Sequence, residues 1–309
     1  MPQKQNLSAV IVIIAFSFLS FNAICQENNI STHFWRIVTP DKSDTSYLLG
    51  TNHICMDSYF SKYKDILKYF DASEVFMAEI VEQVNPSDQV KFDDNSMQWS
   101  RMASRSQRKH IITFFENAFH YPRKIITQHS ITFLRNDMTY YLGYLLSEQV
   151  SGIKGHYFVD DYLTFLSRNN KKEMVGLESA VQHYDYLKFA LAKDESHSTK
   201  TIKENIVALD SLINIYNTNR SAILYDYNSV VLEYYNNDCC YNFSDSSQIP
   251  LENILLKQRN LQWLPNIQKL LNTKKTFIAV GLNHLRYKYG LVQLLKEKGY
   301  IVEPIILAN

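Results

Sequence analysis

The chain has 309 residues, of which 46% are hydrophobic and 20% charged, and its formal net charge is +1. This is the composition of a globular protein that can bury a substantial core. Because the charge is balanced and no basic block stands out, we expect no nucleic-acid partner. The 8 glycines form neither G-x-G-x-x-G nor G-x-x-x-x-G-K-[ST], so the nucleotide-binding fingerprints are absent as well.

Residues 1–25 have the pattern of an export signal. The basic start MPQKQ is followed by the apolar LSAVIVIIAFSFLSF, and the small residues Ala23 and Cys25 stand where a signal peptidase reads. We expect cleavage after Cys25, a periplasmic or secreted mature chain, and no stable membrane span in it. Two alternatives are an uncleaved anchor, although the run is short against the roughly 20 residues of a spanning helix, and a lipid-modified Cys25.

Cleavage at that position would leave three cysteines, namely Cys55, Cys239 and Cys240. An odd number with one adjacent pair is not the pattern of a disulfide framework. No C-x-x-C spacing indicates a structural zinc site.

Residues 33–82 are predicted to be rich in β-structure. HFWRIVT and TSYLLGT, separated by the turn-rich PDKSD, predict a β-hairpin. SYFSKYKDILKYF predicts a short helix over residues 58–70, and EVFMAEIV predicts a buried strand at residues 74–81.

The middle of the chain, residues 95–272, has mostly helical periodicity. One β-like segment interrupts it, KEMVGLES at residues 172–179. These patterns predict that the middle of the protein is a large helical region with one additional strand.

The last residues, 273–309, alternate again. TFIAV predicts a strand, residues 285–299 a helix that ends at Gly299, and YIVEPIIL a final strand. The predicted fold is therefore α/β, with a mixed sheet built from the N- and C-terminal segments and the helical region inserted. Because no low-complexity linker divides the chain, we expect residues 26–309 to form a single domain.

Two of the predicted strands end in the same tetrapeptide. G-x-N-H occurs at residues 50–53 and again at residues 281–284. Glycine lets the backbone turn sharply after a strand, and the strand ends of an open α/β sheet are where ligand-binding groups gather. We therefore predict that His53 and His284 meet at one site.

A carboxylate would complete such a site, and Glu79 follows the apolar VFMA. Two imidazoles and a carboxylate suit a divalent transition metal. The alternative is that both histidines are turn residues bonded to the backbone and that Glu79 is exposed at a strand end.

Several motifs together resemble the TraB/GumN family, which includes the Tiki-type metalloproteases and is related in fold to erythromycin esterases and ChaN-like proteins. They are LLGTNH, FMAEI, GLESAVQ, QRNLQW, FIAVGLNHL and GLVQLLKEKGYIV. The resemblance extends from about residue 34 to residue 306 and implies a mixed α/β fold with His53, His284 and Glu79 at the site. The chain has VGLNHL where many members have a VGAGHL-like segment, which bears on substrate preference more than on metal binding.

The resemblance also implies roles for Glu178 in GLES and Arg259 in QRN. From the residues alone, Glu178 can equally cap the following helix, where the helix dipole favours an acid. Arg259 lies in a predicted helix on which most charges should be solvated, although its planar guanidinium suits a carboxylate or an oxyanion. The remaining polar residues near these motifs are expected to be structural: Asp160, Asp161, His156 and His183.

These residues predict a metal-dependent hydrolase as the leading function. Mn, Co or Zn would be held by His53, Glu79 and His284, with Glu178 as general base and Arg259 stabilising negative charge. The Tiki resemblance implies a peptide substrate. Two alternatives stay open: metal-free hydrolysis of a small-molecule ester by the same residues, as the esterase resemblance implies, and a non-catalytic protein that binds haem or another ligand through its histidines, as the ChaN resemblance permits.

Overall fold

The structure is a computed structural model that describes residues 32–41, 44–82, 98–183, 185–186, 199–219, 231–236 and 253–307. The predicted signal peptide and the adjacent pair Cys239 and Cys240 lie outside the described residues, whereas Cys55 is buried and forms no disulfide with another described residue. Within the described ranges, none of the helices combines the length and the apolar character needed to cross a membrane.

A six-stranded mixed sheet forms the centre of the fold, in the order β4-β3-β5-β2-β1-β6. The strands β4, β3, β5 and β2 run parallel to one another, and β1 is antiparallel to both of its neighbours. Their bounds are β1 Phe34–Val38, β2 Thr45–Thr51, β3 Val75–Ala78, β4 Glu173–Gly176, β5 Thr276–Gly281 and β6 Ile301–Pro304. The predicted α/β fold is confirmed, including the hairpin and the strand within KEMVGLES.

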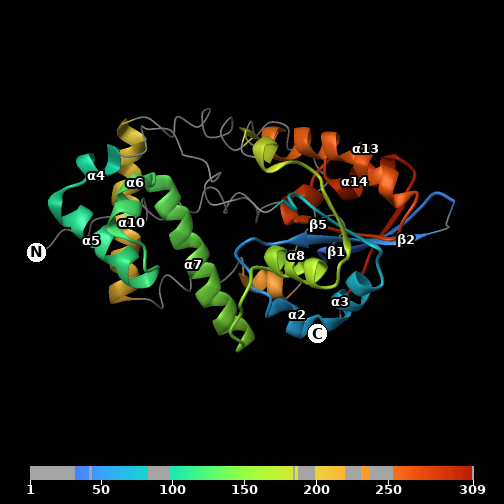
Figure 1. Cartoon of the computed structure of the whole chain (residues 1–309), viewed down its shortest axis with the longest axis horizontal. Helices are drawn as coiled ribbons and strands as arrows, with labels where there is room; N and C mark the ends of the chain where they lie inside the picture. Colours follow the sequence, from blue (N-terminus) through green and yellow to red (C-terminus); the bar gives the residue numbers. More distant parts are fainter. Residues whose placement is uncertain are drawn as a thin grey trace, which may run out of the picture.

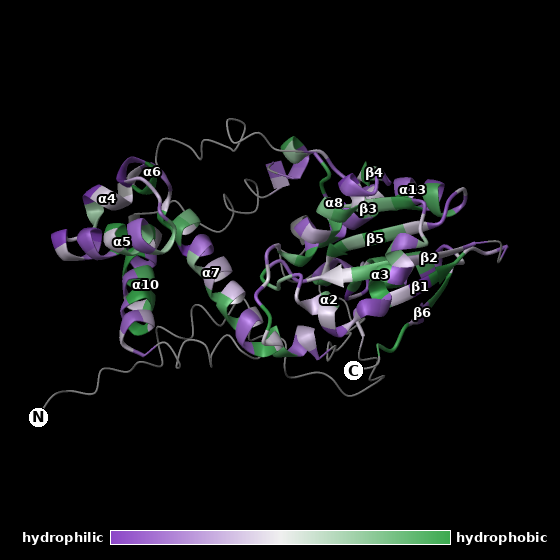
Figure 2. Cartoon of the chain, turned by 60° about the horizontal axis from the view of Figure 1, so that its bottom comes forward, coloured by the Kyte–Doolittle hydropathy of each residue, from purple (hydrophilic) through white to green (hydrophobic). Residues whose placement is uncertain are grey.

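Helices cover both faces of this sheet (Figures 1 and 2). One face packs against α13 (Arg259–Leu271) and α14 (Leu291–Glu297), and the other against α2 (Tyr59–Lys62), α3 (Lys64–Asp71) and α8 (Val159–Asn169). Because β3 and β5 are buried on both faces, their sequences are the continuous, mainly apolar runs VFMA and TFIAVG.

The helical middle region packs around an apolar cluster of its own (Figure 1). Its helices are α4 Gln98–Met102, α5 Arg105–Ala118, α6 Arg123–Gln128, α7 Ile131–Ser151 and α10 Thr199–Thr218. Helix α7 joins this helical lobe to the sheet, because Leu142 belongs to the helical cluster and Leu146 to the cluster beneath the sheet. Gly143 lies between them, and a Cβ there would come within 2.5 Å of the Ile54 carbonyl oxygen. The single-domain organisation stays a prediction.

Two predicted helices differ from the structure. The helix expected over residues 58–70 is interrupted at Tyr63, whose buried hydroxyl donates to the Tyr235 carbonyl oxygen at 2.8 Å. The helix expected over residues 285–299 is confined to α14, because the chain first forms a 3₁₀ turn, η4 (Leu282–Leu285), and then reverses at Tyr287, where φ is 68°. Gly299 has a φ of 89°, as predicted for a glycine that ends a helix.

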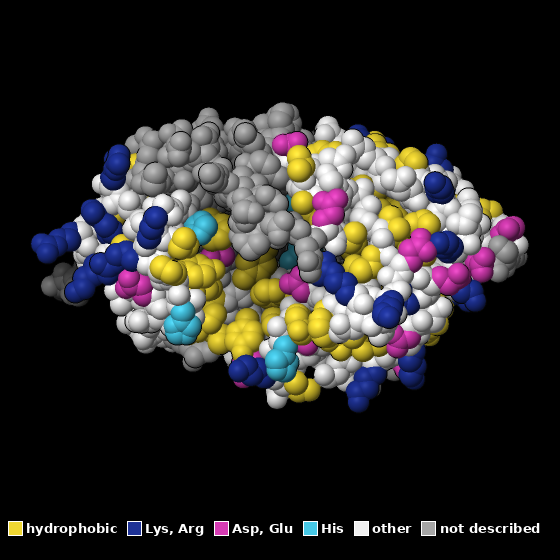
Figure 3. Space-filling model, viewed as in Figure 1, with side chains coloured by type: hydrophobic (Ala, Val, Ile, Leu, Met, Phe, Trp, Pro, Cys, Tyr) yellow, Lys and Arg dark blue, Asp and Glu magenta, His cyan; other side chains and the backbone are white. Residues whose placement is uncertain are grey.

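Hydrophobic side chains gather on one face between the helical lobe and the sheet (Figure 3). The segment from α7 to α8, which connects the two parts, contributes four large exposed hydrophobic residues: Tyr140, Ile153, Tyr157 and Phe165. The rings of Tyr157 and Phe165 stack with their centroids 4.8 Å apart. The polar strand ends that form the candidate site belong to the sheet.

Candidate active site at the strand ends

Four neighbouring parallel strands each deliver one polar side chain at their carboxyl ends. In the order of the sheet, Glu178 follows β4, Glu79 follows β3, His284 follows β5 and His53 follows β2. In parallel α/β sheets, this edge is where ligands bind. The four residues were all predicted from the sequence as site residues, and the strand order places them side by side.

Arg259 lies among these side chains, at the start of α13. It is buried, with only 6% of its side chain exposed, and so is an exception to the solvated charges expected on most of this helix. The π-helical turn η3 (Asn253–Gln258) directly precedes it. Its Nη2 donates to Glu79 Oε2 at 2.5 Å and to Glu178 Oε1 at 2.7 Å, and its Nε donates to Glu178 Oε2 at 3.0 Å. The guanidinium therefore holds the buried carboxylate of Glu178 and the largely buried one of Glu79, and is fixed by them in turn.

Glu178 has both carboxylate oxygens engaged. Besides Arg259, Trp263 Nε1 donates to Oε2 at 3.1 Å, and His183 Nδ1 lies 2.7 Å from Oε1. Burial alone would raise the pKa of Glu178, but the bonds from His183 and Arg259 outweigh it and lower that pKa. These contacts make Glu178 an ionised anchor for Arg259.

His284 is buried, and its ring orientation is fixed from both sides. Nδ1 donates to Asn260 Oδ1 at 2.7 Å, while the amide of Asn260 donates to the carbonyl oxygens of His284 and Tyr289. With the proton on Nδ1, Nε2 carries a lone pair, which accepts from Arg259 Nη1 at 3.0 Å. Burial, together with the charge of Arg259, lowers the pKa of His284 to about 3, so the ring is neutral at pH 7.

His53 lies at the open end of the site, with 54% of its side chain exposed. Its Nδ1 donates to Asp160 Oδ2 at 2.9 Å, and Asp160 Oδ1 accepts from the Thr51 hydroxyl. The carboxylate of Asp160 raises the pKa of His53 to about 9, and Glu79 adds to this effect. When His53 is neutral, the proton stays on Nδ1 and the lone pair is on Nε2, as in His284.

Glu79 lies close to both histidines and next to Gly281. Its Oε1 accepts from the Gly281 N–H at 2.8 Å and is 3.7 Å from His284 Nε2. A Cβ on Gly281 would come within 2.9 Å of His53 Nε2 and 3.2 Å of Glu79 Oε1. Burial would raise the pKa of Glu79, but His284, Arg259, His53 and the Gly281 N–H hold it well below its usual range, so the group is ionised. Gly281 thus leaves room beside an imidazole nitrogen and a carboxylate oxygen.

Two sets of side chains have the donor atoms that a divalent metal prefers. Glu79, Glu178 and His183 each offer one atom within 4.8 Å of the others. However, Arg259 Nη2 is already within hydrogen-bonding distance of all three, so a metal there would have to displace the guanidinium. Of the predicted ligands, His53 Nε2 and Glu79 Oε1 adjoin the space left by Gly281, whereas His284 Nε2, 3.7 Å from Glu79 Oε1, already accepts from Arg259 Nη1.

Sequence reasoning missed three residues of this arrangement. Asp160 and His183 were expected to be structural, yet Asp160 binds His53 and His183 contacts Glu178. Asp160 and Asp161 do lie in the first turn of α8, as expected of helix-start acids. Asn260, one residue after Arg259, orients His284. His156, by contrast, contacts Asp57 through its backbone N–H only, among the described residues.

Comparison with known protein families identifies the family of the chain. The TraB/PrgY/gumN family matches residues 33–304, which is nearly the whole chain, and the chain therefore belongs to this family. No curated protein and no solved structure matches it. The substrate and the reaction consequently have to be argued from the site.

The space beside Gly281 gives a first testable prediction. Its φ of −50° and ψ of 135° are accessible to alanine, so Gly281→Ala should change the free energy of unfolding by no more than about 1 kcal/mol. The added methyl would press on His53 Nε2 and Glu79 Oε1, and we expect loss of ligand binding and hydrolysis. Calorimetric metal titration and urea denaturation of the variant check both parts. A Gly281→Ala protein with full activity would show that this space is not used.

Proposed function

We propose that this protein is a hydrolase that uses a divalent transition metal (Mn, Co or Zn) to cleave a peptide substrate, with His53, Glu79 and His284 as the ligands. The observation that carries the proposal is the common arrangement of the two G-x-N-H histidines. Each has Nδ1 engaged by a side-chain oxygen, from Asp160 or Asn260, and each has Nε2 beside the same carboxylate. In His284 this Nε2 also accepts from Arg259 Nη1, a contact that a bound metal would have to replace. Such outer partners fix the ring orientation of metal-binding histidines.

The remaining residues have separate roles in this proposal. A metal bound there would lower the pKa of a bound water and polarise the scissile carbonyl group. Arg259, held rigidly by Glu178, would place a positive charge where negative charge develops on the carbonyl oxygen. Because both oxygens of Glu178 already accept two contacts each, we assign it to anchoring Arg259 and not to proton transfer.

Metal-free ester hydrolysis is the second candidate, and a specific observation favours it. Arg259 Nη2 already neutralises Glu79 and Glu178, and the exposed His53 is backed by a carboxylate. A histidine held in this way can take a proton from a water molecule without a metal. In this case His53 is the general base and Asp160 holds it in place.

Metal removal and the variant His53→Ala test these candidates. We expect hydrolysis of peptides in a mixed library to stop on chelation, to return with Mn²⁺, Co²⁺ or Zn²⁺, and to be absent in His53→Ala. Because His53 is exposed, the variant should unfold within about 1 kcal/mol of the wild type, whereas Trp263→Ala, at a site that is 1% exposed, should cost about 3–5 kcal/mol.

Two other outcomes of the same measurements would reject the metal-dependent hydrolase. Ester hydrolysis that survives chelation but not His53→Ala would support the metal-free candidate and reject the metal-dependent one. A Soret band on adding haem, without hydrolysis of any library, would reject both candidates in favour of ligand binding.

We also propose that the mature protein acts outside the cytoplasm, in the periplasm or after secretion, on the basis of residues 1–25. Mass spectrometry of the protein from its native host should give an N-terminus at Gln26. An intact N-terminal segment or a lipid on Cys25 would contradict this.

A further inference from the structure

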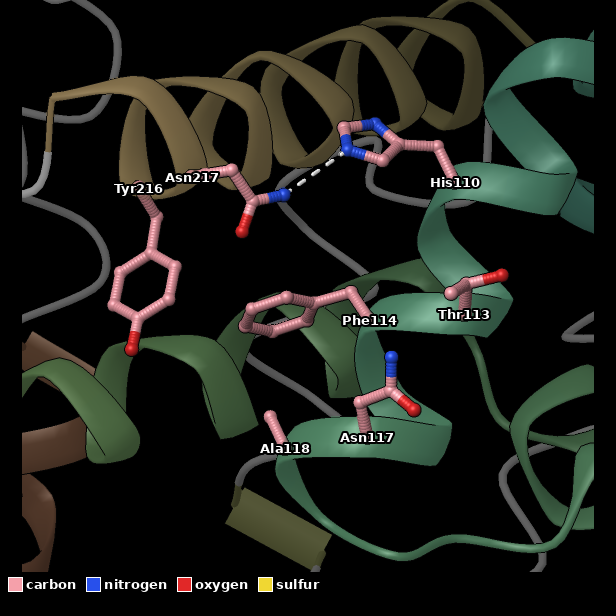
Figure 4. A pocket seen from close by; sticks show the side chains of 7 residues that line it. All are labelled: His110, Thr113, Phe114, Asn117, Ala118, Tyr216 and Asn217. Atoms are coloured by element: carbon pink, nitrogen blue, oxygen red, sulfur yellow. Dashed lines mark hydrogen bonds between the residues drawn. The ribbon is translucent and has the colours of Figure 1, made fainter.

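The helical lobe contains a groove of about 240 Å³ where α10 crosses α5, outside the strand-end site (Figure 4). Five of its residues follow one another at i, i+3, i+4, i+7 and i+8 on α5, so they share one face of that helix. The last turn of α10 supplies the other wall. The lining residues are His110, Thr113, Phe114, Asn117, Ala118, Tyr216 and Asn217.

The floor of this groove is apolar and its rim is polar. Phe114 is buried, and its ring meets that of Tyr216 edge to face with centroids 5.6 Å apart. Thr113, Asn117 and Asn217 are exposed at the rim. A ligand could therefore cover aromatic carbon with one face and meet hydrogen-bonding groups with its edge.

One end of the groove is formed by a histidine that is fixed from both sides. His110 Nδ1 lies 2.7 Å from Asp210 Oδ1, and the side-chain amide of Asn217 lies 3.4 Å from His110 Nε2 (Figure 4). The charge of Asp210 is thus directed to His110 and not to the groove. No lysine or arginine is among the described residues that line it. These features disfavour both anionic and cationic ligands.

We propose that this groove binds a neutral sugar ring. Carboxamides and hydroxyls can both donate and accept hydrogen bonds, and so can the hydroxyl groups of a sugar. The apolar C–H face of the ring would lie on Phe114 and Tyr216. Since the volume is below the roughly 300–1,000 Å³ of drug-sized ligand pockets, we infer a single ring. This proposal does not depend on the hydrolase proposed above.

Calorimetric titration of the full mature chain with neutral monosaccharides and disaccharides tests the proposal, with a uronic acid and an amino sugar as charged comparators. We expect saturable binding of a neutral sugar with a Kd on the order of 1 mM, typical of a small interface. Asn217→Leu should raise the Kd for the sugar about tenfold, because it removes an amide that contacts His110 and, in this proposal, the ligand. If a disaccharide binds more tightly than its terminal monosaccharide, the natural ligand is the end of a glycan. If the two bind equally tightly, the natural ligand is a free sugar.

Asn214→Leu is the matched control, because Asn214 is an exposed asparagine on the same helix, one turn earlier and outside the lining. It should bind the sugar as the wild type does. Absence of saturable binding by every neutral sugar, preference for a charged comparator, or equal effects of the two substitutions would overturn the proposal. Since Asn217 and Asn214 are both exposed, both variants should fold, and circular dichroism verifies it.

Discussion

Arg259→Met should lower the free energy of unfolding by about 3–5 kcal/mol, the typical cost of removing one partner from a buried ion pair. Methionine keeps much of the side-chain volume but leaves Glu79 and Glu178, which are 13% and 3% exposed, without their shared counter-charge. Urea denaturation at pH 7 measures the change. Under the proposed function, hydrolysis should also be lost, because the positive charge assigned to the reacting carbonyl group is removed.

Arg36→Met is the matched control for this prediction. Arg36 pairs with Glu303 on the antiparallel edge of the sheet, but both side chains are about half exposed, so water screens the pair. Its removal should cost no more than about 1 kcal/mol. The double variant Arg259→Met with Glu178→Gln should regain part of the lost free energy of unfolding, because it removes one of the two carboxylate charges that Arg259→Met leaves without a counter-charge. Equal costs for Arg259→Met and Arg36→Met would show that the buried carboxylates do not depend on Arg259.

The strand-end residues were predictable because the relevant signals are local. An apolar run that ends in glycine and is followed by a polar side chain marks the end of a buried strand, and parallel strands carry such ends to one edge. This reasoning placed His53, Glu79 and His284. It could not give the strand order, which depends on long-range pairing, although this order decides that Glu79 lies between Glu178 and His284.

The partners of those residues were not predictable, because they depend on tertiary packing. Asp160 and Asp161 are adjacent acids at a helix start, and only the docking of α8 decides which of them meets the end of β2. Arg259 was expected at the site through the family resemblance alone, because its helix carries other polar residues and the residue pattern does not reveal that Arg259 faces two carboxylates. The helix expected over residues 285–299 failed for a related reason, because Asn260 holds the carbonyl oxygens of His284 and Tyr289 in a turn.

Asp160→Asn should change His53 in two ways. The carboxylate of Asp160 is the main reason that the pKa of His53 is raised to about 9, so its removal should bring that pKa down toward the ordinary value of about 6.5. A raised pKa means that the protonated ring is favoured, and a protonated ring can neither bind a metal nor accept a proton. The acid limb of the pH profile of kcat/KM should therefore move to lower pH in the variant.

Above both pKa values the same variant should be slower and not faster. At that pH His53 is neutral in both proteins, so the two differ only in how firmly the His53 ring is held. The neutral amide oxygen of an asparagine accepts more weakly from Nδ1, and Thr51 loses its charged acceptor. Partners of this kind are typically worth 10–100-fold in metal affinity or activity, and we expect a loss of about that size in the plateau of kcat/KM. Imidazole NMR titration of His53 separates the pKa shift from the loss of rate.

Asp161→Asn provides the control, since it removes the same charge from the adjacent position of α8. Within the described residues, Asp161 acts on His53 through its charge and makes no hydrogen bond to it, so its loss should leave the plateau near that of the wild type and shift the pKa of His53 much less. If the two variants behave alike, net charge near the site and not the His53–Asp160 hydrogen bond sets the activity. A lower plateau in Asp160→Asn alone, together with a shifted acid limb, would identify Asp160 as the residue that positions His53 for either hydrolytic mechanism.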